Sequence, residues 1–206
     1  MGLKQSLGFK AATRNPPPVG GSFSKDLKQR GLNTDDVRLG VMDGLPGPET
    51  VFKEEFTYSK IQRCQLHVAR NVLAKVPKKL KKEVADEIRS IFYASSKKKA
   101  QQFFRDFEKK RQQDLPSAVK CLGNSLESCL TYLEFPEDEW ISLRTTNVIE
   151  RLNKEFKRRT RPMEIVAGEN ACYRLLAFIR LKMELHWRST PVGKVRRNLP
   201  FFNNFS

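Results

Sequence analysis

Apolar residues recur three and four positions apart over much of the chain, which predicts a helix-rich protein. The middle of the sequence shows this spacing clearly, on both sides of a turn-like Ala-Ser-Ser at residues 94–96. The apolar positions concerned are Val84, Ile88, Ile91, Phe92, Phe103, Phe104 and Phe107. We interpret the phenylalanine stripe as core. A base-stacking platform is the alternative, which we disfavour because stacking aromatics usually lie among cations on an open sheet. Residues 115–133 predict a further pair of helices.

Two short apolar runs are typical of strands. Residues 37–47, VRLGVMDGLPG, predict a buried strand that ends at Asp43, followed by a Gly/Pro loop. A plain turn at Asp43-Gly44 is the alternative, since Asp-Gly is a common turn dipeptide. Residues 61–64 predict a second short strand. A helix with its apolar stripe at Ala69, Val72, Leu73 and Val76 is predicted to follow.

Residues 145–161, TTNVIERLNKEFKRRTR, predict an amphipathic helix that Pro162 ends. Its buried stripe would be Ile149, Leu152 and Phe156. The charged residues fall on the other side: Glu150, Lys154, Lys157, Arg158 and Arg161. An acid embedded in a phosphate-binding surface suggests nucleic-acid chemistry. In the alternative interpretation Asn147 is the N-cap, and Glu150 merely completes a capping box.

Composition fits a nucleic-acid partner without proving one. Lys and Arg total 39 against 23 Asp and Glu, a net charge of +16 that favours polyanions, although ribosomal and other basic proteins share it. The four cysteines lack a disulfide-framework spacing, and we expect a cytoplasmic protein. No apolar run reaches the about 20 residues of a membrane span. Cys64 and His67 have the spacing of half a zinc site, but the other histidine, His186, is distant.

Three segments in this order carry a family resemblance. VMDGLPG, QRCQLHVARN and RTTNVIERLNKEFKRRTR together resemble the Mutator-type transposases of bacterial insertion sequences. LGFKAAT, DLKQRGL and LLAFIRLKMELHW extend the resemblance towards both ends. The fold that it implies is α/β and helix-rich overall, an incomplete RNase H-like core interrupted by an all-helical insertion. We expect core in residues 1–76 and 141–188, the insertion in 77–140 and a loose tail in 189–206.

The resemblance also implies a chemistry. In that family two Asp and one Glu hold two divalent cations, Mg²⁺ or Mn²⁺, and by motif Asp43 matches the second acid and Glu150 the third. Cys64, His67, Asn147 and Arg151 match motif positions that support the site. Arg158, Arg159 and Arg161 match the family's basic tail. Together with Lys154 and Lys157 of the same helix they are the residues that we predict to bind DNA. The implied partners are double-stranded DNA, as element ends and target, and further copies in a homo-oligomer, with no membrane.

The first acid of the family has no counterpart in the chain. It precedes the segment matching LGFKAAT, where this sequence has six residues and no Asp. Asp26 lies in a helix-like segment, and Asp35 and Asp36 lie in a turn. We therefore expect a truncated transposase with little or no activity alone, or a non-catalytic fragment that binds DNA or interferes with assembly. The proline- and glycine-rich residues 14–22 predict an irregular linker.

Overall fold

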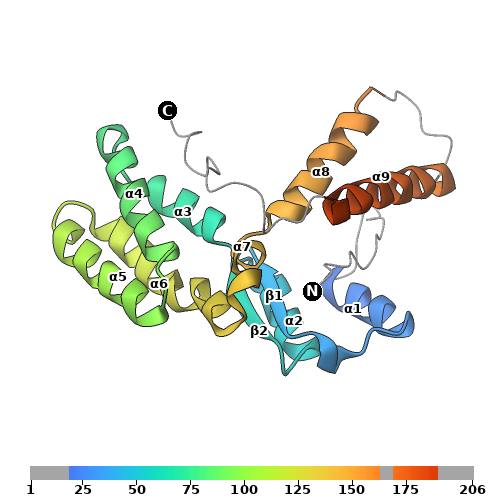
Figure 1. Cartoon of the computed structure of the whole chain (residues 1–206), viewed down its shortest axis with the longest axis horizontal. Helices are drawn as coiled ribbons and strands as arrows, with labels where there is room; N and C mark the ends of the chain where they lie inside the picture. Colours follow the sequence, from blue (N-terminus) through green and yellow to red (C-terminus); the bar gives the residue numbers. More distant parts are fainter. Residues whose placement is uncertain (1–18, 163–168, 190–206) are drawn as a thin grey trace.

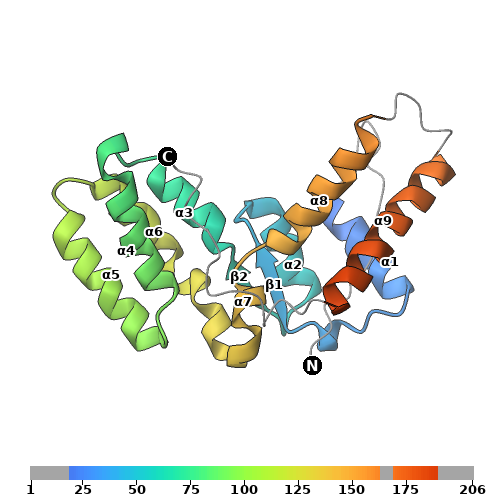
Figure 2. The same cartoon turned by 45° about the horizontal axis from the view of Figure 1, so that its top comes forward.

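The computed structural model describes residues 19–162 and 169–189. A small parallel sheet lies between a bundle of helices and a second helical group (Figures 1 and 2). The α-helices and strands follow in this order: α1 Val19–Gln29, β1 Leu39–Met42, α2 Pro46–Glu55, β2 Lys60–Arg63, α3 Gln65–Leu73, α4 Lys81–Phe92, α5 Lys97–Arg111, α6 Pro116–Cys129, α7 Trp140–Leu143, α8 Asn147–Thr160 and α9 Glu169–Ser189. Short 3-10 helices span Thr34–Asp36, Lys78–Leu80, Thr131–Glu134 and Glu137–Glu139.

The sheet of the described residues has two parallel strands, joined by a crossover through α2. Leu39 pairs with Lys60 at one end and Met42 with Arg63 at the other. Both strands therefore finish at the same edge, where the Cys64 amide donates to the Met42 carbonyl at 2.6 Å. The predicted strand before Asp43 is confirmed, but it is half-buried and not buried as predicted. The second strand begins one residue earlier than predicted. The small sheet and the helix-rich character agree with the expected class, whereas the RNase H-like core and the domain boundaries stay predictions.

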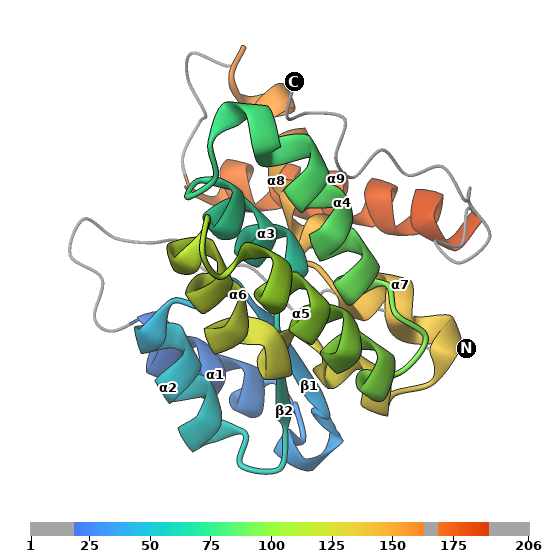
Figure 3. The ribbon, with the colours of Figure 1, turned by 90° about the vertical axis from the view of Figure 1, so that its left-hand side faces the viewer.

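Four helices, α3 to α6, form the bundle (Figure 3). The predicted core residues Val84, Ile88, Ile91, Phe92 and Phe107 are buried there. Phe104 packs against them, but Phe103 is 41% exposed, so its prediction as core is wrong. The reason is helical geometry: positions 104 and 107 share the face turned to the bundle, and position 103 lies on the flank of that face.

The prediction of two helices in residues 115–133 is wrong. One α-helix, α6, continues to Cys129, and a 3-10 helix follows. Its buried stripe runs without interruption through Ala118, Leu122, Leu126 and Cys129. Gly123 does not break the helix, because the Phe104 ring packs where a side chain would be: a Cβ at Gly123 would lie 3.1 Å from that ring.

Two buried glutamines connect the sheet to the bundle. The side-chain amides of Gln62 and Gln65 donate to the Cys129 carbonyl at the end of α6, at 2.8 and 2.9 Å. The Gln62 side-chain oxygen accepts from the Tyr132 amide at 2.8 Å. Gln62 is fully buried. Because buried polar groups are costly when unpaired, these bonds fix β2 and α3 against one place on the bundle.

The linker prediction for residues 14–22 is wrong from position 19 onward, because α1 begins at Val19; residues 14–18 lie outside the described residues. Helix α1 packs against α2, with Leu27 buried and Lys28 2.5 Å from Glu55. This packing outweighs the low helix propensity of the two glycines in the first turn. The segment LGFKAAT and the tail beyond residue 189 also lie outside the description, and within it no helix is long and apolar enough to span a membrane.

Candidate functional site

Asp43 directly follows β1 and is exposed to solvent at the strand-end edge of the sheet. Asp43 is thus at a strand end, as predicted, and Gly44 next to it has φ +90. Arg63, the last residue of β2, donates from Nη2 to the Gly44 carbonyl at 3.2 Å. The neighbouring strand therefore holds the turn that presents Asp43.

Cys64 connects the two downstream motifs. It lies at the N-cap of α3, is fully buried, and accepts from the Thr146 amide through Sγ at 3.5 Å. Its Sγ also lies 3.4 Å from the Thr146 hydroxyl, and the Gln65 amide donates to the Arg144 carbonyl at 3.0 Å. The C-x-x-H segment and the segment before α8 are therefore in direct contact.

Glu150 lies in the first turn of α8 and is half-buried. Its Oε1 accepts from the Thr146 hydroxyl at 3.3 Å and lies 3.8 Å from His67 Nε2. The capping-box alternative is wrong: Thr146 is the N-cap, makes no side-chain cap bond, and directs its amide to Cys64. Asn147 is already helical, and its side chain lies outside the description. Glu150 is thus held towards α3 rather than used to cap its own helix.

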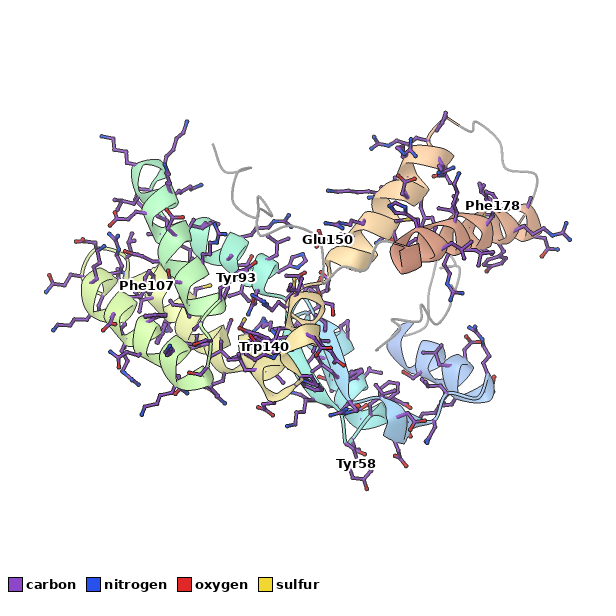
Figure 4. The ribbon with its side chains drawn as sticks, viewed as in Figure 1. Tyr58, Tyr93, Phe107, Trp140, Glu150 and Phe178 are labelled. Carbon is purple, nitrogen blue, oxygen red and sulfur yellow. The ribbon has the colours of Figure 1, made fainter. Side chains whose placement is uncertain are left out.

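Strand pairing and side-chain contacts connect three separate segments near one edge of the sheet. Asp43 and Cys64 follow paired strand ends, and Thr146 connects Cys64 to Glu150. Figure 4 shows Glu150 at the start of α8, on the side of the helix near the sheet. The two carboxylates offer the oxygen ligands that Mg²⁺ and Mn²⁺ prefer. Residues 19–162 and 169–189 hold no group of three or more His, Cys, Asp and Glu able to bind a metal ion.

Helix α8 carries the predicted basic residues on its outer side. Lys154, Lys157, Arg158 and Arg161 are exposed, as is Arg151, whereas Leu152 is buried and Phe156 half-buried. The side chain of Ile149 lies outside the description. Arg158 and Arg159 each bind Glu155, at 3.0 and 3.1 Å, and lower the pKa of that carboxyl. Part of the predicted cationic tail is therefore paired within the helix.

Arg144 contributes to the site without having been predicted. Its guanidinium lies over Tyr93, 4.3 Å from the ring centroid, and over Tyr132 at 5.1 Å, and its Nε donates to the Trp140 carbonyl. The bundle thereby holds the chain immediately before Thr145 and Thr146. No local pattern could have indicated this, because the aromatic rings come from distant segments.

Comparison with known proteins agrees with the sequence motifs. Residues 1–190 match the model of a family described as "Transposase, Mutator family". A transposase for insertion sequence element IS905 of Lactococcus lactis is 29% identical over 175 residues, which cover 85% of this chain and 44% of that protein. A transposase for IS6120 of Mycolicibacterium smegmatis is 30% identical over 179 residues, 85% of this chain and 55% of that protein. The chain thus spans about half the length of the curated relatives it matches.

Proposed function

The chain belongs to the Mutator family of transposases, and from this premise we propose that it serves DNA transposition with Asp43 and Glu150 as ligands of a divalent-cation site. Proteins that it resembles are named as transposases of insertion sequences. The substrate in this proposal is double-stranded DNA, as element ends and as target.

One observation carries the proposal most directly, the contact of Cys64 and Glu150 with the same Thr146 hydroxyl. Cys64 follows β2 next to the strand that ends before Asp43. The contact therefore brings the third motif to the edge that presents the first. A chance acid on a basic helix would not need such a connection to the sheet.

In this proposal some residues hold the cations, and others orient the carboxylates or bind the DNA backbone. When bound, a pair of Mg²⁺ or Mn²⁺ ions would activate the attacking oxygen and stabilise the leaving one. Asp43 and Glu150 would hold it, and His67 and Thr146 orient the Glu150 carboxylate. The exposed cations of α8 bind backbone phosphates and position the strand. Water is the first nucleophile, at the element end, and the freed 3′-OH is the second, at the target.

We further propose that these residues alone have little or no strand-cutting activity, because two carboxylates do not complete the family's set of three. The alternative function is that of a fragment which binds DNA without cutting it, or which interferes with transposase assembly. The exposed cations Lys154, Lys157 and Arg161 on α8 favour retained binding of DNA. A homo-oligomer in the functional complex belongs to the same proposal.

DNA binding tests this proposal through its salt dependence. The test variant replaces four α8 cations by Gln: Lys154, Lys157, Arg158 and Arg161. Each phosphate contact contributes about 0.9 to the slope of log K against log salt, so this variant should bind a labelled duplex with a flatter slope than the wild type. Fluorescence anisotropy at several salt concentrations measures it.

A matched control removes the same charge from exposed lysines of the bundle. These are Lys75, Lys79, Lys82 and Lys109. The control should keep most of the wild-type slope, and Glu150→Gln should bind as tightly as the wild type or more tightly, because it removes a like charge from the phosphate path. An unchanged slope in the α8 variant would exclude this helix as the DNA surface.

A further inference from the structure

An open cavity of about 500 Å³ lies between α4 and α5, away from Glu150. Two aromatic rings line it, Tyr93 from the end of α4 and Phe103 from α5. Both are unusually exposed for a helical bundle, at 44% and 41%. Phe107, one turn further along α5, is by contrast 3% exposed. The core of the bundle therefore does not account for these two rings.

The charges around the cavity have one sign. Arg89 and Lys99 line it, and no Asp or Glu is among its lining residues. The Arg89 guanidinium lies 5.8 Å from the centroid of the Tyr93 ring. Aromatic rings interleaved with cations are the arrangement by which proteins bind single-stranded nucleic acid.

The cavity is connected to the candidate site through one side chain. Arg144 packs on Tyr93 and directly precedes Thr145 and Thr146, which lead to Glu150. In Figure 4 Tyr93 lies between Phe107, inside the bundle, and Glu150. Packed side chains therefore join the cavity to the segment that precedes Glu150.

We propose that this cavity binds an unpaired base of single-stranded DNA, which stacks on Phe103 while Arg89 and Lys99 bind the adjoining phosphates. The proposal rests on the proposed function, that the chain acts on DNA. An unpaired base is required because the faces of bases in a duplex are covered by their neighbours, whereas a ring in a cavity needs an open face. Opening of the duplex near the cut would supply such a base.

The experiment separates bases from phosphates. Fluorescence anisotropy of the full chain compares a labelled thymidine oligonucleotide of about ten nucleotides with an abasic oligonucleotide of equal length and charge. The wild type should bind the thymidine strand about tenfold more tightly, the gain expected from one stacked base. Phe103→Ala should reduce this preference to within about twofold, because alanine has no ring for the base to stack on.

Controls fix the origin of the effect. Tyr58→Ala removes another exposed ring, 83% exposed and remote from the bundle, and should keep the full preference. Phe103→Leu retains apolar volume without a π-face and should lose the preference, which guards against misfolding of the alanine variant. Replacing Arg89 and Lys99 by Gln should weaken the binding of the thymidine and the abasic oligonucleotide by the same factor. A full preference in Phe103→Leu or Phe103→Ala would overturn the proposal.

Failure of this site and failure of the proposed function give different results. The wild type could bind duplex DNA with a steep salt dependence and yet bind thymidine and abasic strands equally. That result would exclude the cavity as a base-binding site and leave the proposed function intact. A folded wild type that binds neither duplex nor single strands rejects both.

Discussion

At the scale of single residues, the Asp43-Gly44 turn depends on a backbone conformation that favours glycine. Gly44 has φ +90, and a Cβ there would lie 2.2 Å from the Arg63 guanidinium. Gly44→Ala should therefore lower the free energy of unfolding by about 1–2 kcal/mol. It should also displace Asp43, because Arg63 loses the carbonyl that it binds. Urea unfolding measures the first effect.

Gly47→Ala is the matched control for this turn. Gly47 lies in the first turn of α2, and a Cβ there would meet nothing within 4 Å. Alanine should leave stability unchanged or raise it by about 0.5 kcal/mol, since it restricts the unfolded chain. Equal losses in the two variants would show that the turn at Gly44 is not special.

The sequence predicted where the charged residues lie, but not which residues the side chains around the candidate site contact. Asp43 at a strand end and the exposed cations of α8 follow from local pattern, because a short strand and an amphipathic helix leave periodic signals. The bond from Thr146 to Cys64 and the ring contacts of Arg144 have no such signal. They join residues far apart in sequence, and only the packed structure brings these together.

At the scale of helices, a buried ion pair joins α4 to α5. Arg111 is 5% exposed and donates to Glu87 at 3.0 and 2.7 Å, and its Nη2 also lies 2.6 Å from Glu83. Arg111→Ala removes the two hydrogen bonds to Glu87 and one of the two cationic partners of Glu83, and it should cost about 2–3 kcal/mol of unfolding free energy. Lys109→Ala, at an exposed site in the same turn, should cost less than about 0.5 kcal/mol.

The ion pairs of Glu83 with Lys110 and Arg111 predict that stability depends on pH. Hydrogen bonds from Lys110 and then Arg111 lower the pKa of Glu83 in the folded chain. Its ionised form therefore stabilises the fold above the ordinary glutamate pKa of about 4.3, and this contribution is lost as pH falls through the lowered value. The difference between wild type and Arg111→Ala should shrink from about pH 7 to about pH 3. A constant difference would contradict the ionic explanation.

Helix existence could be read from the sequence more reliably than helix limits. The apolar stripes of α3 and α4 correctly predicted their buried faces, because the 3.6-residue period is a strong signal, whereas the stripe of α5 was right at Phe107 and wrong at Phe103. Propensity misled at Gly20-Gly21, where the sequence predicted a linker and the chain is helical in α1, which packs against α2. Local preferences of about 1 kcal/mol per glycine are readily overcome by tertiary contacts.

At the scale of the whole molecule, the candidate site joins the sheet and α8, while the bundle supports both. Gln62 and Gln65 fix the bundle to β2 and α3, and Arg144 fixes it to the start of α8. The sequence predicted the order of these parts through family resemblance. The RNase H-like core stays a prediction, because the sheet within the described residues has two strands.

The central claim is that Asp43 and Glu150, far apart in sequence, bind the same divalent cations. Electron paramagnetic resonance of Mn²⁺ titrated into the full chain tests it, with variants Asp43→Asn and Glu150→Gln. Asp26→Asn serves as control, since Asp26 lies in α1 and binds Arg30. Each site variant should weaken Mn²⁺ binding about tenfold, the double variant should bind Mn²⁺ little more weakly than either single variant, and the control should match the wild type. Wild-type Mn²⁺ affinity in both site variants would contradict it.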